Sequence, residues 1–361
     1  MKTIMVPRLP KVTSFNTPKN VAWLTLLLGV LAHVTPIRAQ EPIPEIRKLF
    51  LGDDPIEVTL TYDIKKLLKN KYEEEDYWPA SFSSKIGEEE FQASIRIQPR
   101  GNFRRKNCFM PPLRLNFKKC EQGEMKSWGK VKLVTHCKAS KTFEQYVLKE
   151  YLSYKMFNVL SDMSFQVRLG RFTYVDSLQK RKPITKWGFL IEQTKHLAER
   201  HNAIELEEVV VNTQETNRKF MTLVSVFQYF LGNTDWSVPA LHNIKLLKIQ
   251  DFKENAPYAI PYDFDYSGIV NAPYAIPNES LGIKTVRERL FRGYGRSEAE
   301  FQAVYDLFIE KKSELYALVE NCKHLEKFHR NEVIQYMDSF YEIVENPKLA
   351  KRRIADSSRG R

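Results

Sequence analysis

The sequence is poor in the residues that mark several common kinds of site. It has four cysteines in 361 residues and no Cys-x-x-Cys pair, so it lacks a zinc-binding signature. Its 14 glycines include no Gly-x-Gly-x-x-Gly run, which excludes that type of glycine-rich phosphate loop. Apart from residues 21–34, no apolar run approaches the length of a membrane helix. The chain is nevertheless 43% hydrophobic and long enough for two globular parts.

The net charge of the body of the chain is small, although the formal net charge of the whole chain is +12. Residues 1–40 hold five Lys or Arg and no acid, and residues 348–361 hold six basic residues and one acid. The remainder, residues 41–347, therefore carries only about +2. Nucleic-acid binding needs a basic face on the folded part, so we expect no nucleic-acid partner. We interpret residues 348–361 as a basic disordered tail.

The first 40 residues are typical of a targeting segment. A basic stretch precedes the apolar run 21–34, and small residues follow it around Ala39. This order predicts a signal peptide, with a retained N-terminal anchor as the alternative. We therefore expect an exported protein, in the periplasm, the cell envelope or the medium, with no stable membrane span after cleavage. An oxidising compartment would allow one disulfide among Cys108, Cys120 and Cys137, and buried free thiols are the alternative.

Hydrophobic periodicity divides the rest of the chain into two parts. Alternating patterns predict an antiparallel sheet within residues 41–193. Its expected strands are Ile56–Ile64, Phe91–Gln98, Leu113–Phe117, Val131–His136, Phe165–Val175 and Trp187–Gln193. One helix, opened by Thr142, interrupts this series, and helices beginning near Asn212, Ser297 and Leu325 make residues 194–347 mainly helical.

The stretch from Gly232 to Gly268 gathers carboxylates beside apolar strands. Asn243–Ile249 and Tyr258–Phe264 are both strand-like, and the polar link between them suits a turn. A turn centred near Lys253 would place Asn243 opposite Asp263. The sequence therefore predicts a hairpin that returns the chain to the loop where it began.

The predicted hairpin suggests a metal site. Asp263 and Asp265 are two residues apart, so on a strand their side chains would share a face. Their carboxylates and the amide oxygen of Asn243 form a hard-oxygen set suited to Mg²⁺ or Mn²⁺ together with phosphate. Asp235 would then be free to act as a catalytic base.

A basic turn is the candidate for binding phosphates. It runs from Arg100 to Lys106 and combines Gly101 with four cations, whose guanidinium forks and exposed amides suit phosphate oxygens. Arg100 is the first choice as a ligand, and either Arg114 or Lys132 on the strands behind it would pair with a phosphate. A basic turn in water, with no ligand, is the alternative.

Taken together, these motifs resemble the spore-coat CotH kinase family, an atypical branch of the kinase-like fold. The matching residues are Arg100-Gly101-Asn102, the Trp187–Glu192 strand, the Asp235…His242-Asn243 loop and Asp263-Phe264-Asp265. They cover about residues 95–270. The sequence departs from ordinary kinases in lacking Val-Ala-Ile-Lys, in the eight-residue spacing from Asp235 to Asn243, and in Phe-Asp where those kinases have Phe-Gly.

The resemblance implies an α+β, two-lobed protein-kinase-like fold, with an antiparallel β lobe carrying one helix and a mainly helical second lobe. It implies an ATP- and Mg²⁺-dependent phosphotransferase acting on a protein or peptide hydroxyl. It also implies that Glu150 faces the cation on the sheet, and that the backbone at Ile191 and Glu192 meets the nucleotide base.

Two other functions are consistent with the sequence. One is an exported binding or scaffold protein that keeps the kinase fold without the reaction. The other is metal-dependent phosphodiester hydrolysis, for which His242 would be the base. The segment from Arg287 to Arg296 would face an acidic substrate in a kinase-like chain, and a solvated basic face is its alternative.

Overall fold

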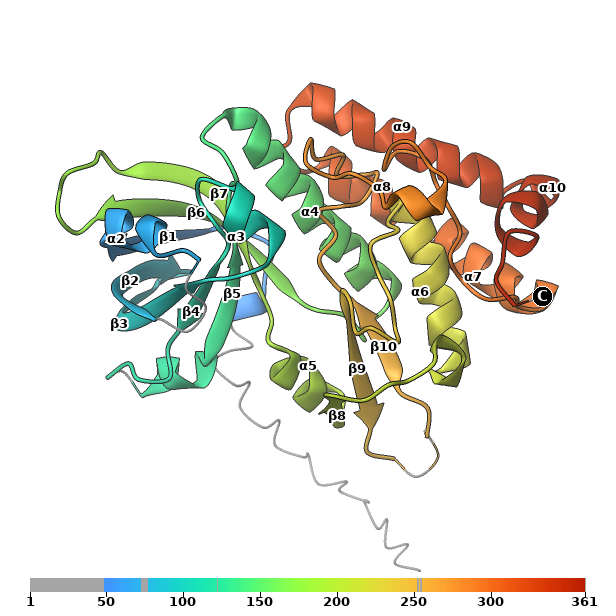
Figure 1. The fold of residues 1–361 in the computed structure, drawn as a ribbon, viewed down its shortest axis with the longest axis horizontal. Coiled ribbons are helices and arrows are strands. Elements are labelled where there is room, and N and C mark those ends of the chain that lie inside the picture. Colours follow the sequence, from blue (N-terminus) through green and yellow to red (C-terminus); the bar gives the residue numbers. More distant parts are fainter. Residues whose placement is uncertain (1–48, 73–76, 122, 252, 254, 361) are drawn as a thin grey trace, which may run out of the picture. The chain divides into compact units, whose positions relative to one another are not determined.

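The computed structural model describes residues 49–72, 77–121, 123–251, 253 and 255–360, so the expected signal segment lies outside it. Seven strands close into a barrel in the order β1-β2-β3-β4-β5-β7-β6 (Figure 1). The strands are β1 (Ile56–Tyr62), β2 (Trp78–Ile86), β3 (Glu89–Pro99), β4 (Leu113–Asn116), β5 (Lys130–Val134), β6 (Val167–Asp176) and β7 (Ile184–Ile191). Alternate side chains of β1, from Ile56 to Tyr62, are buried in the barrel core.

The prediction of a two-lobed protein-kinase-like fold with an antiparallel β lobe is wrong. Neighbouring strands of the barrel are antiparallel except β1 and β6, which pair in parallel and close the sheet on itself. The result is a closed mixed barrel, a separate small sheet and a set of helices. Alternation in the sequence shows which face of a strand is buried, but it does not show which strand lies beside it.

Two glycines allow the closing strands to pack tightly. Gly170 of β6 lies opposite Gly188 of β7, and the Phe172 ring lies against both. A Cβ at Gly188 would come within 2.8 Å of the Val134 carbonyl oxygen, and one at Gly170 within 2.9 Å of the Ile56 carbonyl oxygen. Side chains at these positions would therefore force the neighbouring strands apart.

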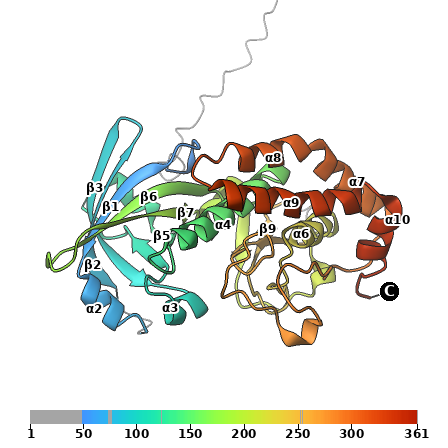
Figure 2. The ribbon, with the colours of Figure 1, turned by 90° about the horizontal axis from the view of Figure 1, so that it is seen from above.

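Helix α4 (Lys141–Leu160) lies between the barrel and the helices in both views (Figures 1 and 2). It contacts β6 and β7 on one side and α8 (Lys312–Glu320) on the other. Buried residues therefore occur all around it, and they include the charged residues Lys149 and Glu150. A helix in this position can offer charged groups to a site beside the barrel.

The second half of the chain forms the other hydrophobic core. Its helices are α5 (Thr194–Arg200), α6 (Arg218–Leu231), α7 (Glu298–Glu310), α8, α9 (Lys327–Val344) and α10 (Pro347–Ala350). Strands β8 (Ala203–Leu206), β9 (Ile244–Ile249) and β10 (Tyr258–Pro261) form a three-stranded antiparallel sheet. Every residue of α6 from Phe220 to Leu231 is buried, and the helix ends at Gly232 in the left-handed conformation that glycine readily adopts.

Several elements differ from the sequence-based expectation. Helix α2 (Ile64–Lys69) and the serine-rich β2 are not among the elements expected from the sequence. The sequence predicts a disordered tail from residue 348, whereas α10 and a π-helical turn (Lys351–Ala355) bury Ile354. The amide of Arg359 also donates to the Gly293 carbonyl. Burial of one apolar side chain in an otherwise basic segment accounts for this order.

A disulfide joins Cys108 to Cys137, whereas Cys120 and Cys322 take part in no disulfide. Cys108 follows the short helix α3 (Phe103–Asn107), and Cys137 follows β5. The amides of Phe109 and Met110 both donate to the Cys137 carbonyl, so backbone bonds reinforce the link. The bridge therefore fixes the basic turn against the end of β5.

None of the helices within the described ranges has both the length and the apolar character needed to cross a membrane.

The disulfide provides a test of this architecture. Replacing Cys108 and Cys137 together by Ser should lower the free energy of unfolding by about 2–4 kcal/mol, because the bridge closes a long loop of the unfolded chain. Urea titration without reductant measures the change. The matched control is Cys322→Ser, which breaks no bridge and should change stability by less than about 1 kcal/mol. An equal loss in both variants would show that the bridge contributes nothing.

Candidate functional site

The predicted hairpin is present, but its pairing is shifted by one residue. Pro261 lies opposite Ile244, and the amide of Tyr262 donates to the Asn243 carbonyl, so Asn243 faces Tyr262 and not Asp263. Strand β10 ends at Pro261, and both Asn243 and Asp263 have left-handed backbones, with φ of 53° and 62°. Asp263 and Asp265 therefore lie on a turn after the strand, and the argument that they share a strand face does not hold.

The loop after α6 holds Asp235 in a fixed orientation. The amide of Asp235 donates to Asn233 Oδ1 at 2.9 Å. His242 Nε2 lies 2.8 Å from Asp235 Oδ1, and Asn243 Nδ2 donates to Asp235 Oδ2 at 3.0 Å. The structure thus brings Asp235, His242 and Asn243 together, and the Asp235 side chain remains 38% exposed.

Arg104 lies between two buried carboxylates. Its Nη1 is 3.2 Å from Glu150 Oε2 and 3.9 Å from Asp265 Oδ2, and its Nη2 donates to the Thr135 carbonyl. Asp265 Oδ2 also accepts a hydrogen bond from the Tyr274 hydroxyl at 3.1 Å. Glu150 is 1% exposed, and its Oε1 is buried without a hydrogen-bond partner in the described structure.

Burial disfavours the charged forms of two carboxylates in this cluster. It raises the pKa of Asp265 to about 7, an effect that Asp263 and Asp235 increase and that Arg104 and Tyr274 oppose. Burial also raises the pKa of Glu150 well above its usual value, and Asp265 and Asp263 add to this rise while Arg104 opposes it. A further cation would therefore favour the charged forms of both carboxylates.

Asp263 differs from Glu150 and Asp265 in its contacts. Within the described structure its carboxylate has no hydrogen bond or ion pair, whereas its amide donates to the Tyr154 hydroxyl at 2.8 Å. Tyr154 follows Glu150 by one turn of α4, so one face of this helix carries one acid of the cluster and supports the backbone of another.

Cations also lie near Asp263. Lys132 of β5 faces Arg114 of β4, and the Lys132 ammonium lies 5.1 Å from the centre of the Tyr262 ring. Burial lowers the pKa of Lys132 to about 7, helped by the charges of Arg100, Lys245 and Arg114 and opposed by Asp263. Of the three predicted phosphate ligands, Arg100 and Arg114 are therefore both close enough to Lys132 to repel its charge.

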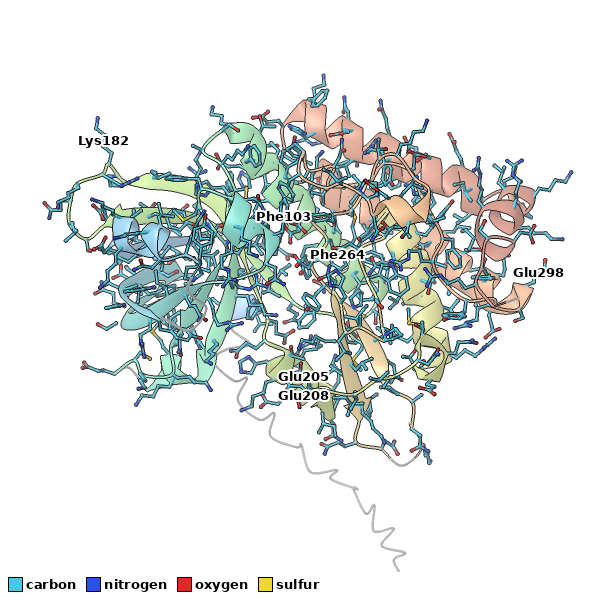
Figure 3. All side chains as sticks on the ribbon, viewed as in Figure 1. Phe103, Lys182, Glu205, Glu208, Phe264 and Glu298 are labelled. Atoms are coloured by element: carbon cyan, nitrogen blue, oxygen red, sulfur yellow. A yellow bond between two sulfur atoms is a disulfide. The ribbon has the colours of Figure 1, made fainter. Side chains whose placement is uncertain are left out.

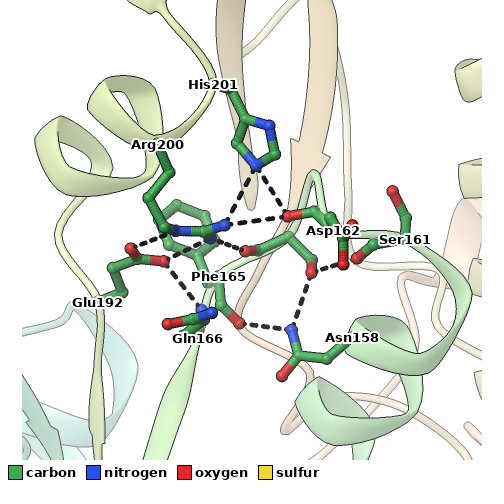
Figure 4. Close-up of polar contacts among 9 residues, drawn as sticks. Asn158, Ser161, Asp162, Phe165, Gln166, Glu192, Arg200 and His201 are labelled. Carbon is green, nitrogen blue, oxygen red and sulfur yellow. Dashed lines mark hydrogen bonds and ion pairs between the residues drawn. The ribbon is translucent and has the colours of Figure 1, made fainter. Parts of the chain in front are cut away.

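The remaining predicted residues, Ile191 and Glu192, have internal partners. Ile191 lies between Lys132 of β5 and Val167 of β6 in the barrel. Both carboxylate oxygens of Glu192 accept hydrogen bonds from Arg200, at 2.8 and 2.9 Å, and Oε2 also accepts one from the Gln166 amide (Figure 4). The Glu192 amide donates to the Gln166 carbonyl. The Glu192 side chain therefore stabilises the junction of β7 and α5.

The arginines of the 287–296 segment also bind their own chain. Arg289 donates to the Tyr229 and Phe230 carbonyls at the end of α6. Arg292 donates to the Thr234 and Trp236 carbonyls on either side of Asp235. These arginines stabilise the end of α6 and the Asp235 loop. The sequence suggested instead that they face an acidic substrate or form a solvated basic face.

A cavity of about 970 Å³ lies away from these residues. Leu160, Phe220, Tyr258 and Val304 are among the residues that line it, between α4, α6 and α7. Within the described ranges, no three His, Cys, Asp or Glu side chains are arranged to hold a metal ion by themselves. A cation at Asp263 would therefore need further ligands, from Asn243 and from water or a phosphate.

Sequence reasoning missed Arg104, Tyr154 and Tyr274. Arg104 was hidden among the cations of the basic turn, and nothing in its sequence neighbourhood distinguishes it from Arg105. The position of Tyr154, four residues after Glu150, gave a usable signal, because such residues share a helix face. The heptapeptide Asn-Ala-Pro-Tyr-Ala-Ile-Pro occurs twice, at residues 255–261 and 271–277, and Tyr274 belongs to the second copy. Because the two copies are identical, the local sequence does not show that they differ in structure.

Comparisons with known proteins add little to this geometry. No family model and no curated protein matches the chain. Among solved structures it is similar to the crystal structure of a Helicobacter pylori proinflammatory kinase, CtkA. The identity is 11% and the TM-score 0.35, with 77% of this chain and 88% of that chain covered. This distant structural neighbour is a kinase, but at these values the likeness establishes neither fold nor activity.

The hydrogen bond between Tyr154 and Asp263 gives a test of the site geometry. Tyr154→Phe should destabilise the protein by about 1–3 kcal/mol, because it leaves the Asp263 amide without its partner while keeping the ring. Tyr151→Phe is the matched control on the same helix, since the Tyr151 hydroxyl has no hydrogen bond in the described structure; its effect should stay within about 0.5 kcal/mol. Equal effects, measured by urea unfolding, would contradict the geometry.

Proposed function

We propose that the protein is an ATP- and Mg²⁺-dependent phosphotransferase that acts on a hydroxyl of a protein or peptide. The observation that carries this proposal is the meeting of two opposite charge clusters at Asp263. Asp263 lies close to the acids and Arg104 of one cluster, and it also lies close to Lys132 with its neighbouring cations. Phosphoryl transfer depends on positioning and on neutralising charge more than on covalent help from the protein.

The residues at Asp263 fit a magnesium ion. The Asp263 carboxylate has no protein partner, and Asn243 donates its amide nitrogen to Asp235, which leaves its Oδ1 for a cation. Mg²⁺ in proteins commonly takes one or two carboxylates and completes its coordination with water and substrate phosphates. When bound, Mg²⁺ would neutralise charge on the transferred phosphate. Asp265 is better described as a supporting carboxylate, because Arg104 and Tyr274 already engage it.

Asp235 is the proposed base. His242 and Asn243 each bond to one of its carboxylate oxygens, so its orientation is fixed while more than a third of the side chain stays accessible. A carboxylate held in this way can accept the proton of a substrate hydroxyl as the oxygen attacks. His242 would orient Asp235 in this reaction.

Arg100, Arg114 and Lys132 are the proposed phosphate ligands. The repulsion of Lys132 by Arg100 and Arg114 in the free protein is what an anionic ligand would relieve. Glu150 acts through Arg104 and not through these cations. For the nucleotide base we propose the backbone beside Ile191 and Glu192, next to Lys132.

We also propose that the protein works after export, which fits the N-terminal segment and the Cys108–Cys137 bridge. Its partner would then be an exported protein or peptide.

Transfer of labelled phosphate from ATP tests the reaction. With Mg²⁺ or Mn²⁺, and with casein and the protein itself as acceptors, the wild type should transfer label. Asp235→Ala should lower the rate at least about 100-fold through loss of the base. Asp263→Ala should also weaken nucleotide binding. Lys182→Ala, at the exposed tip between β6 and β7, is the control and should leave the rate unchanged (Figure 3). ATP binding without transfer would indicate a non-catalytic binding protein.

The lowered pKa of Lys132 predicts that nucleotide binding depends on pH. Above pH 7 the side chain is mostly neutral in the free protein, and an adjacent phosphate favours its charged form, so binding should take up a proton. Affinity should therefore fall as pH rises from about 7 to 9.

Calorimetry at pH 8 in buffers of different ionisation enthalpy measures this proton uptake. Lys132→Arg should still bind nucleotide but without the uptake, because its charge is permanent. Equal binding enthalpies in all buffers for the wild type would contradict the assignment of Lys132.

A further inference from the structure

Arg104 occupies the space that a cation bridging Glu150 and Asp265 would need. Its guanidinium lies 3.2 Å from one carboxylate and 3.9 Å from the other. The arginine side chain is buried, and its Nη2 is held by the Thr135 carbonyl. With both terminal nitrogens directed at protein groups, Arg104 is placed to neutralise these acids and not to reach a phosphate.

The surroundings of Arg104 hold it firmly in this position. The Cys108 amide donates to the Arg104 carbonyl, and the bridge from Cys108 to Cys137 ties α3 to the strand that carries Lys132. On its other side α3 is fixed by Phe103, whose ring lies 5.7 Å from that of Tyr266 and 5.6 Å from that of Tyr274 (Figure 3). The guanidinium therefore belongs to the permanent structure of the site.

The contacts of the three carboxylates favour Asp263 as the place for a divalent ion. Glu150 and Asp265 share the Arg104 guanidinium, whereas the Asp263 carboxylate has no hydrogen bond or ion pair in the described structure. The buried Oε1 of Glu150 also has no partner there, so the protein does not satisfy every oxygen of this cluster. A divalent cation would therefore bind at Asp263, where Arg104 does not already engage the carboxylate.

We propose that Arg104 takes the place of a second metal ion, so that the site binds one divalent cation, at Asp263 and Asn243, and excludes another from Glu150 and Asp265. The inference deepens the proposed function, on which it rests for the identity of the Asp263 cation site. It makes Arg104 a residue that determines how many cations the site takes, and Tyr274 a second ligand that keeps Asp265 turned toward it. An ion pair that only stabilised the fold would not affect this number.

Titration of the full chain with Mn²⁺ at pH 8, with free Mn²⁺ measured by electron paramagnetic resonance, tests the proposal without requiring catalysis. The wild type should bind one Mn²⁺, and Asp263→Ala should lose it. Arg104→Gln should bind a second Mn²⁺ at least about tenfold more tightly than any further ion binds to the wild type. Combining Glu150→Gln with Arg104→Gln should remove that second ion again.

Controls separate this effect from loss of folding. Arg104→Lys keeps a cation in the site and should bind one Mn²⁺, like the wild type. Lys182→Gln removes a positive charge from the exposed β6–β7 tip and should also bind one. Should Arg104→Gln fail to fold, the count for the wild type and for Arg104→Lys still decides the question.

Two Mn²⁺ ions on the wild type, or none, would overturn the inference, as would an unchanged count in folded Arg104→Gln. The proposed function fails in a different way. A wild type that binds one Mn²⁺ but no ATP argues against phosphotransfer and leaves the role of Arg104 intact. A wild type that transfers phosphate with two bound Mn²⁺ ions supports phosphotransfer and contradicts the role of Arg104.

Discussion

Carboxylates buried away from water must be neutralised, and this requirement organises the centre of the molecule. Glu150 and Asp265 share Arg104, which reaches them from a helix far away in the sequence. An unpaired buried charge is strongly destabilising, so the parts of the chain that supply these three groups must be held together accurately. The disulfide beside α3 and the aromatic contacts of Phe103 hold Arg104 in place, and helix α4 holds Glu150.

Helix α4 connects the two hydrophobic cores to the site. It packs against the closed barrel and against the helices of the second half, and from this position it presents Glu150 to Arg104 and Tyr154 to the Asp263 backbone. Helix α6, which is buried from Phe220 to Leu231, ends at Gly232 and leads into the Asp235 loop, which Arg292 stabilises. The catalytic and metal-binding candidates are thus carried by rigid elements, although each of them lies near an element end or in a turn.

Much of this could be predicted from the sequence, but not the contacts that matter most. The strands of strong alternation, the end of α6 at Gly232 and the β9–β10 hairpin follow from local patterns, and the structure confirms them. The barrel could not be predicted, because the parallel pairing of β1 with β6 joins distant segments whose patterns do not specify a partner. The repeated heptapeptide makes the same point. Its first copy includes β10, whereas its second forms a turn that places Tyr274 on Asp265, so tertiary contacts and not local sequence decide its conformation.

The central claim is that acids and cations meet at Asp263 to hold one divalent ion and a triphosphate. A crystal structure grown with Mn²⁺ and a non-hydrolysable ATP analogue, with anomalous scattering from manganese, tests it most directly. The account predicts one manganese peak beside Asp263 and Asn243, phosphates against Lys132 and Arg100, and Arg104 still between Glu150 and Asp265. A manganese peak between Glu150 and Asp265, or a nucleotide bound away from Lys132, would contradict it.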